Sequence, residues 1–451
     1  MNFEKIGLQV PKILLPKTGT DMQRWAVIAC DQYTSDPAYW QRLEQQTADD
    51  ISTLQLVFPE VYLEESDGDR RIAAINRAME DYLANGSLEE QPPGFILVDR
   101  KTSAVESRKG LIVALDLEHY DYTKGAQSLI RATEGTILDR LPPRIKVREN
   151  APIELPHIMV LIDDPDKTVI EPLFAEKLST VYDFELLENG GHLKGCRVDR
   201  PELIEQVVKA LEKLADPTAY HKKYETDGEV MLYAMGDGNH SFATAKAIWE
   251  KLKAETDDPA EVMDHPARFA LVELVNVHDP GLEFEAIHRV LFDVDIAHLK
   301  KTMEQFYSDA GTPFTFIPCA DLAAAQRVAA ERSDEHAFPA VLTGQFGVCV
   351  VANPQYTLVV ATLQVFLDRY LEENPAVRVD YIHGEQTVTE LGCQSASAGF
   401  YLPSISKHDL FKTIVHDGAL PRKTFSMGEA DEKRFYLECR RIQKSVSDLE
   451  D

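Results

Sequence analysis

The chain has 451 residues, 44% hydrophobic and 27% charged, which is ordinary globular composition and enough length for two or three lobes. Its 47 basic and 75 acidic residues give a formal net charge of −28, which disfavours nucleic acid and anionic lipid as partners. No apolar stretch reaches the roughly 18 residues of a membrane span, and the six scattered cysteines form no C-x-x-C pair, so we expect a soluble cytoplasmic protein with reduced thiols and no structural zinc.

Hydrophobic patterning predicts alternating strands and helices through the first 295 residues. Dense apolar and β-branched runs predict strands at 26–30, 94–98, 111–115, 158–162, 230–235 and 268–276. Helical spacing of apolar residues predicts helices near 38–54, 68–85 and 200–216, and a further helix from Phe242. The second of these ends at Asn85-Gly86, as a C-cap does.

Beyond residue 295 the pattern predicts a separate small unit. A helix is followed by a strand at 314–317, an Ala-rich helix and two strands at 347–352 and 357–361. The tail adds a strand near Val377, another at 400–402 and a helix at 407–417. We therefore expect a mixed α/β fold in which residues 1–295 form the core, 296–370 form an appended αβαββ lobe, and 371–451 complete the core.

The most informative segment is the loop Gly236-Asp237-Gly238-Asn239-His240-Ser241, between a predicted strand and a predicted helix. Amides at a helix N-terminus attract anions, and a glycine lets the backbone approach a phosphate closely. His240 can donate to a phosphoryl oxygen, Asn239 or Ser241 can hydrogen-bond, and Asp237 can hold Mg²⁺ or orient a nucleophile. The same residues also suit an ordinary helix cap and turn.

The loop resembles the D-G-H-H-R-Y-A-A-A string of domain-of-unknown-function family 1015. Three more segments resemble motifs of that family in the same order. Residues Arg131 to Thr136 resemble the motif R-P-H-E-x-T, residues Asp279 to Arg289 resemble D-P-G-L…H-R, and residues Pro421 to Phe425 resemble P-x-K-S-T-x-F. Ordered matches at several sites are far more specific than any one of them. The chain is therefore identified as a member of this family.

The D-G-x-H loop is also similar to that of ParB/sulfiredoxin-type folds, which include kinases acting on free serine. In those proteins the loop holds nucleotide phosphates at a helix N-terminus, so the resemblance implies a ParB/sulfiredoxin-like core and makes Gly238, Asn239 and Ser241 the candidate phosphate-binding residues. Asn239 replaces the first His of the string and Ser241 replaces its Arg, which removes a bidentate phosphate clamp. The candidates for the missing charge are Arg131, Arg140, Arg289 and Lys423.

The family resemblance also suggests a general base. Glu134 matches the Glu of the H-E-x-T string, although Thr133 replaces the neighbouring His. We assign a catalytic role to Glu134 alongside Asp237 and His240, against the alternative that Glu134 is a solvated carboxylate in a surface salt bridge.

Three further groups have weaker sequence support. His288 and Arg289 can reach a phosphate or serve the fold, and Lys423 can contact a ligand or lie exposed in its loop. Asp31 and Tyr33 stand where the family has a P-Y-D-type string, and we assign neither a role.

These residues support three hypotheses about function. The first is a phosphotransferase that uses Mg²⁺ with ATP or ADP and acts on a small hydroxylated metabolite, with free serine as the first substrate to test. The second is a regulatory protein that binds a nucleotide or metabolite without turnover, which the missing loop Arg favours. The third is a phosphatase-type hydrolase that uses the same site with water as the nucleophile.

Overall fold

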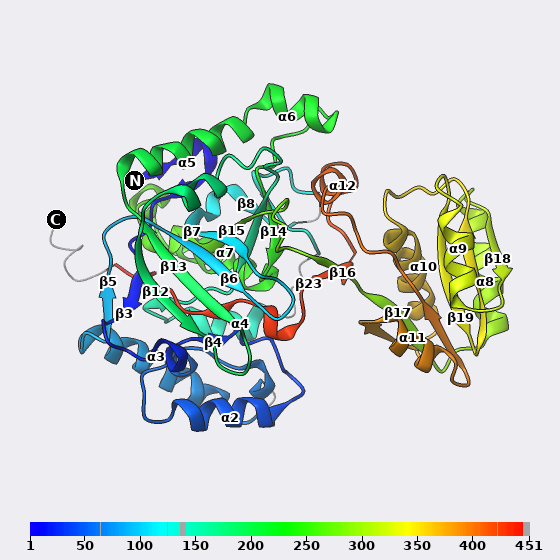
Figure 1. Cartoon of the computed structure of the whole chain (residues 1–451), viewed down its shortest axis with the longest axis horizontal. Coiled ribbons are helices and arrows are strands. Elements are labelled where there is room, and N and C mark those ends of the chain that lie inside the picture. The colour runs from blue at the N-terminus through cyan, green and yellow to red at the C-terminus, as the bar shows by residue number, and fades with distance from the viewer. Residues whose placement is uncertain (64, 124, 136–140, 422, 445–451) are drawn as a thin grey trace. The chain divides into compact units, whose positions relative to one another are not determined.

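The computed structural model describes residues 1–63, 65–123, 125–135, 141–421 and 423–444. The chain divides into two compact units, unit 1 with Met1–Leu282 and Gly428–Asp451, and unit 2 with Glu283–Met427. Each unit combines a sheet with helices, which confirms the predicted mixed α/β class (Figure 1).

Unit 1 is built on an 11-stranded mixed sheet. Nine strands follow the order β12-β13-β6-β7-β15-β11-β14-β9-β8, and the hairpin β1–β2 adds to β7. The strands in this sheet are β1 (Asn2–Phe3), β2 (Leu8–Gln9), β6 (Phe95–Lys101), β7 (Arg108–Asp116), β8 (Tyr120–Asp121), β9 (Ile130–Arg131), β11 (Met159–Ile162), β12 (Ser179–Glu185), β13 (His192–Val198), β14 (Tyr233–Asp237) and β15 (Phe269–Asn276).

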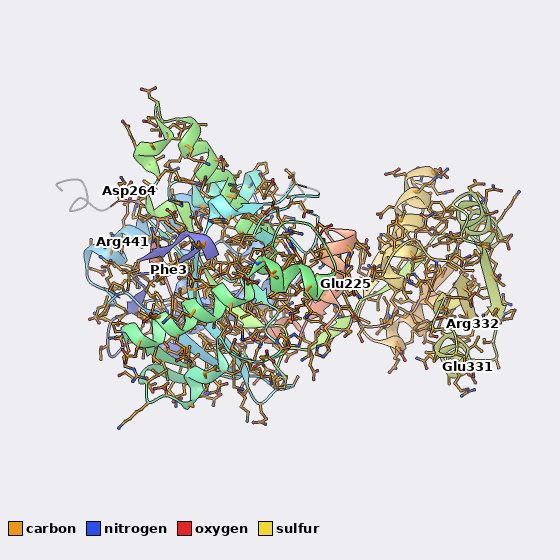
Figure 2. The ribbon with its side chains drawn as sticks, turned by 90° about the horizontal axis from the view of Figure 1, so that it is seen from above. Phe3, Glu225, Asp264, Glu331, Arg332 and Arg441 are labelled. Atoms are coloured by element: carbon orange, nitrogen blue, oxygen red, sulfur yellow. The ribbon has the colours of Figure 1, made fainter. Side chains whose placement is uncertain are left out.

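The two faces of this sheet are both buried, because side chains alternate along each strand. Leu111, Val113 and Leu115 of β7 pack on one face with α5 (Pro201–Leu214) and α7 (Asn239–Ala254), whereas Ile112 packs on the other with α2 (Pro37–Thr47) and α3 (Gly68–Ala84). Helix α5 and the pair α2 and α3 lie on opposite sides of the strands in Figure 1. Phe3 of the N-terminal hairpin, labelled in Figure 2, packs against the hydrophobic core on the face that α5 and α7 cover.

Strand pairing decides which residues surround the end of β14. This strand is antiparallel to β11, with Met159 opposite Asp237, and parallel to β9, with Arg131 opposite Ala234. The start of β11 and the residues that follow β9 therefore lie at the same edge of the sheet as the loop after β14.

Unit 2 contains a six-stranded sheet with the order β18-β20-β19-β22-β17-β21, all neighbours antiparallel. One face packs against α8 (Ile296–Asp309) and α10 (Val359–Glu373), and the other against α9 (Leu322–Ala330) and α11 (Glu385–Gly392). The strands are β17 (His288–Phe292), β18 (Phe314–Pro318), β19 (His336–Leu342), β20 (Gln345–Val351), β21 (Arg378–Ile382) and β22 (Ser397–Phe400). Helix α12 (Leu410–Asp417) follows these strands.

Unit 2 is larger than the lobe that the sequence predicts over 296–370. Residues 371–427 belong to it rather than to the core, because β21 and β22 both pair with β17 and close the sheet. The strand predicted at 357–361 is wrong: this apolar run begins helix α10, and β20 pairs with β18 and β19. A short apolar run with β-branched residues suits a strand and a buried helix equally, so periodicity alone does not separate them.

The segment after Gly428 returns to unit 1 and crosses it as a strap over residues 428–442. Its strand β24 (Phe435–Tyr436) pairs with β4 (Val27–Ile28), and β25 (Arg440–Arg441) pairs with β10 (Ile153–Glu154). Arg434 is buried between the carboxylates of Glu273 and Glu438, and its Nε donates to the Pro156 carbonyl at 3.2 Å. The Arg434 guanidinium thus links the strap to Glu273 of β15 and to the backbone just before β11.

All six cysteines are free thiols, as the sequence predicts. Among the described helices none has both the length and the hydropathy that a membrane-spanning segment needs.

Replacing Arg434 by Met should destabilise unit 1 by about 3–5 kcal/mol, because two buried carboxylates would lose their cation. Trp25, Trp40 and Trp249 are the only tryptophans in the sequence and are buried in unit 1, so their fluorescence during urea denaturation reports this unit. The control is Lys444→Met, which removes the partly exposed ion pair with Asp264 and should change the free energy of unfolding by less than about 1 kcal/mol. Equal effects of the two substitutions would contradict this role for Arg434.

Candidate active site

The loop that the sequence singled out is a strand-to-helix junction in the structure. Strand β14 ends at Asp237, Gly238 adopts a left-handed conformation with φ 77°, and α7 begins at Asn239. An ideal Cβ on Gly238 would stand 3.0 Å from the Ile158 Cα, so only glycine fits without displacement of the backbone. The first-turn amides of α7 therefore follow a residue that has no side chain to cap them.

Asp237 is held by a lysine from the strap. Its Oδ1 accepts from the Gly238 amide at 2.8 Å, and its Oδ2 lies 3.2 Å from Nζ of Lys433. Burial alone would raise the pKa of the Asp237 carboxyl, but Lys433, His157 and the Gly238 amide together lower it below its ordinary value. The junction thus carries an ionised carboxylate with an ammonium group beside it.

His157, at the start of β11, connects the loop to the N-terminal segment. Its Nδ1 lies 2.7 Å from the Tyr436 hydroxyl, and its Nε2 lies 3.4 Å from Oγ of Ser241 and 3.7 Å from a carboxylate oxygen of Asp31. The Tyr436 hydroxyl also donates to Sγ of Cys30 at 3.0 Å, which leaves its oxygen to accept from His157. In that tautomer Nε2 is the acceptor, facing Ser241 and Asp31.

The remaining loop residues lie in the first turn of α7. His240 and Ser241 are partly buried, and Ser241 also lines a cavity beneath the junction. Oδ1 of Asn239 is buried and has no hydrogen-bond partner within the described part of the chain. A buried acceptor without a partner is costly unless a ligand or water satisfies it.

The candidates after β9 have different surroundings. Arg131 is buried, and its Nε donates to the Ser128 carbonyl at 3.0 Å and its guanidinium also to the Glu229 carbonyl, so it holds local backbone. Burial lowers the pKa of Arg131. Glu134 is partly buried, three residues beyond Arg131 and at the same sheet edge as Asp237. Arg140 lies outside the described residues.

Three of the predicted phosphate contacts belong to unit 2. His288 and Arg289 are buried on β17, where His288 Nδ1 accepts from the Leu402 amide at 3.0 Å and Arg289 Nε donates to Gln364 at 3.0 Å. Lys423 is exposed in a loop with φ 57°. All three residues belong to unit 2, and their role at the loop remains a prediction.

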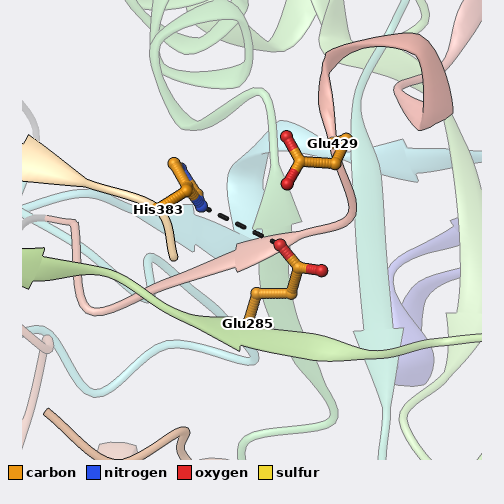
Figure 3. Close-up of side chains that lie close together, drawn as sticks. All are labelled: Glu285, His383 and Glu429. Atoms are coloured by element: carbon orange, nitrogen blue, oxygen red, sulfur yellow. Dashed lines mark ion pairs between the residues drawn. The ribbon is translucent and has the colours of Figure 1, made fainter. Parts of the chain in front are cut away.

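Unit 2 has an acid–histidine pair of its own, Glu285 on β16 (Phe284–Ala286) with His383. Figure 3 shows these two side chains pointing toward each other, with their ion pair dashed. His383 Nδ1 lies 3.8 Å from Oε2 of Glu285, and both side chains are about 40% exposed. Exposed pairs of this kind contribute little and do not by themselves define a site.

Sequence reasoning did not select His157, Lys433 or Tyr436, and it assigned no role to Asp31. These residues lie far apart in the chain, and they meet because β24 pairs with β4 and β11 pairs with β14. The sequence signals concerned Asp31 alone: its place where the family has a P-Y-D-type string, and its position at the end of the predicted strand 26–30, where α/β proteins often keep polar side chains. Nothing local marks Lys433.

Comparisons with known proteins identify a family and several solved structures. The family model described as "Protein of unknown function (DUF1015)" matches residues 14–370, well over half of the chain. No curated protein matches the chain.

Several solved structures match this chain at 10–12% sequence identity, in alignments that cover about three quarters of it. A point mutant of a free serine kinase in complex with ADP has a TM-score of 0.38 at 12% identity, covering 74% of this chain and 92% of its own. A conserved hypothetical protein from Pyrococcus furiosus has a TM-score of 0.35 at 12% identity, covering 74% and 95%. SbnI with C-terminal truncation from Staphylococcus aureus has a TM-score of 0.35 at 10% identity, covering 75% and 92%.

Replacing Gly238 by Ala should destabilise unit 1 more than replacing Gly86 by Ala. Both glycines have a left-handed φ, 77° and 72°, so each substitution costs roughly 1–2 kcal/mol in backbone conformation. At Gly86 the added Cβ meets no described atom within 4 Å, whereas at Gly238 it meets the Ile158 backbone, which adds about 1–3 kcal/mol. Urea denaturation followed by tryptophan fluorescence measures both, and equal losses would show that the close approach to Ile158 does not constrain the junction.

Proposed function

We propose that this chain, which belongs to the family of unknown function DUF1015, is a phosphotransferase that binds a Mg-nucleotide at the loop 236–241 and phosphorylates a small hydroxylated metabolite. The observation that carries the proposal is the Asp237–Lys433 ion pair at the first turn of α7. It puts an ammonium group next to helix amides in a molecule whose formal charge is −28.

Nucleotide binding has three supports at this junction. The Gly238 conformation leaves the first amides of α7 uncapped by a side chain, and Lys433 supplies positive charge. The third support concerns the rest of the nucleotide: Asn239 Oδ1 is a buried acceptor that a ribose hydroxyl or a base amino group can satisfy. Lys433 takes the electrostatic role that the Arg of the family string has and that Ser241 cannot fill. A lysine acts as a point charge, so the resulting clamp is less directional than a guanidinium.

Two carboxylates are candidates for aligning the acceptor hydroxyl and taking its proton. Asp31 lies 3.7 Å from His157 Nε2, which in turn faces Ser241, so two groups that can each accept a proton lie near the first turn of α7. Glu134, the residue that the family string favours, is at the same sheet edge. Either carboxylate fits the need of phosphoryl transfer for a positioned base.

Mg²⁺ would arrive with the nucleotide rather than bind first to the protein. Both oxygens of Asp237 have partners, the Gly238 amide and Lys433, so this residue alone offers a weak metal site. Mg²⁺ commonly uses one or two carboxylates together with substrate phosphates and water. With phosphates bound, Lys433 can shift toward them and leave Asp237 as a metal ligand, where the ion would neutralise phosphate charge.

Incubation of the pure protein with serine, Mg²⁺ and ATP or ADP should yield phosphoserine, and Lys433→Met should lower the rate roughly a hundredfold because one charge-stabilising group is lost. Lys444→Met, which removes another Lys–Asp pair near the end of the described chain, should leave the rate unchanged. His240→Ala should also reduce the rate.

Other outcomes of this assay separate the alternative functions. No phosphoserine above the His240→Ala background, together with thermal stabilisation by ATP or ADP, would contradict phosphotransfer and favour a nucleotide-binding regulator. Release of phosphate from phosphoserine without nucleotide would favour a hydrolase.

Asp31→Asn and Glu134→Gln distinguish the two carboxylates. The variant that removes the base should lose about 10²- to 10⁴-fold in kcat, because proton transfer is then unassisted, while nucleotide binding is retained. We expect Asp31→Asn to show this loss, since Asp31 is the carboxylate within reach of His157. A full loss in Glu134→Gln with normal turnover in Asp31→Asn would reverse the assignment.

A further inference from the structure

A cavity of about 130 Å³ lies beneath the junction, and Ser241, His157 and Tyr436 line one end of it. Most of the other lining side chains are aliphatic or aromatic, among them Leu56, Val57, Phe58, Met79, Val147 and Ile153. An apolar cavity of roughly 150 Å³ in another protein binds benzene. The cavity beneath the junction therefore suits a ligand of about six non-hydrogen atoms and excludes a whole nucleotide.

The charged side chains that line the cavity are paired with one another. Glu60 forms an ion pair with Arg144, and Glu154 forms one with Arg148 at 2.6 Å. The buried carboxylate of Glu154 also binds Arg440. A charged ligand would have to break or share one of these pairs after losing its own hydration, which is costly in a buried site. An uncharged ligand leaves both pairs intact.

The polar end of the cavity has room for one hydroxyl group. His157 Nε2 lies 3.4 Å from Ser241 Oγ, which is longer than the roughly 3 Å of a well-formed hydrogen bond. The neighbouring polar atoms have shorter bonds: His157 Nδ1 lies 2.7 Å from the Tyr436 hydroxyl, and Thr244 Oγ1 donates to the His240 carbonyl at 2.7 Å. A ligand hydroxyl can donate to Nε2 and accept from Ser241, so that two hydrogen bonds replace one long one.

The rim of the cavity is partly apolar as well. Leu63 is 38% exposed, one of the few large hydrophobic side chains among the described residues with so much exposure, and it lines the cavity. Pro143, on α4 (Leu141–Arg148), is another exposed lining residue. Exposed apolar side chains at the rim of an apolar cavity favour the entry of a ligand with a hydrocarbon body.

We propose that this cavity is a binding site for a small uncharged alcohol, with a hydrocarbon body of about five carbon atoms and a single hydroxyl at the Ser241–His157 end. The inference goes beyond the proposed function and does not rest on it, because it assigns a ligand to the cavity rather than to the phosphate-binding loop. The hydrocarbon body matches the aliphatic and aromatic walls, and the single hydroxyl matches the one long hydrogen bond. A polyol of the same size would bury further hydroxyls among hydrocarbon side chains.

Saturation-transfer NMR titrations of the full chain test this selection without nucleotide. Isoamyl alcohol, glycerol and isoamylamine have the same number of non-hydrogen atoms and differ in polarity and charge. We expect a dissociation constant of the order of 1 mM for isoamyl alcohol, because its hydrocarbon body leaves water. Glycerol and isoamylamine should bind at least about tenfold more weakly, because their buried hydroxyl or ammonium groups would lack partners. Equal affinity for the three compounds, or no binding of isoamyl alcohol, would overturn the inference.

Filling the cavity should remove the binding. Ala151 is buried in the cavity wall, so Ala151→Leu places a larger hydrocarbon side chain in the space and should weaken isoamyl alcohol at least about tenfold. The matched control is Ala84→Leu, the same substitution at an exposed position at the end of α3, which should leave the affinity unchanged.

A second variant guards against a failure of Ala151→Leu to fold, since overpacking a core is destabilising. Val147→Phe fills the cavity from a half-buried lining position on α4 and should also weaken isoamyl alcohol. Undiminished binding in a filled variant whose thermal unfolding temperature equals that of Ala84→Leu would overturn the inference, and so would an equal loss in all three variants.

These measurements are independent of phosphoryl transfer. Binding of isoamyl alcohol that the filled variants lose, in a chain that forms no phosphoserine, would refute the proposed function and leave this site intact. Phosphoserine formation by a chain that does not bind isoamyl alcohol would refute this site and leave phosphotransfer intact.

Discussion

The pairing of Arg434 with Glu273 and Glu438 fixes the strap in the interior of unit 1. Its immediate neighbour is Lys433, the cation beside Asp237, and two residues further is Tyr436, the partner of His157. The Arg434 Nε also binds the carbonyl of Pro156, the residue before His157. The buried guanidinium of Arg434 therefore helps to position Lys433, Tyr436 and His157 around the junction. Loss of its ion pairs would displace these three residues together.

This arrangement bears on a conflict between the composition and the proposed chemistry. A chain with a formal net charge of −28 repels phosphate on average, and its loop has lost the arginine of the family string. The positive charge comes instead from a segment far along the chain, which folds back onto unit 1 after unit 2. The local field at the first turn of α7 is thus a property of the fold rather than of the loop.

Local sequence was sufficient for the elements with the strongest periodicity. The helices α3, α5 and α7 and the strands β6, β7 and β15 were predicted within a few residues, because their apolar periodicity is strong and their ends carry turn residues. The prediction failed at 357–361, where an apolar run begins α10, and at the boundary of unit 2, where β21 and β22 join β17. The first error arises because a short apolar run suits a strand and a buried helix equally. The second concerns strand partners distant in the chain, which local propensity does not encode.

By itself, the sequence determined the mixed α/β class, the strand-to-helix junction at Gly238 and the family resemblance, since each depends on residues that are neighbours in the chain. Only the tertiary structure decided which charges meet there: Asp31, His157 and Lys433 come from three segments joined by strand pairing and one buried ion-pair network. Charge interactions fall off over a few ångströms in space, whereas spacing along the chain carries no information about that distance once the connection is long. The sequence therefore predicted the junction but not the charged residues that surround it.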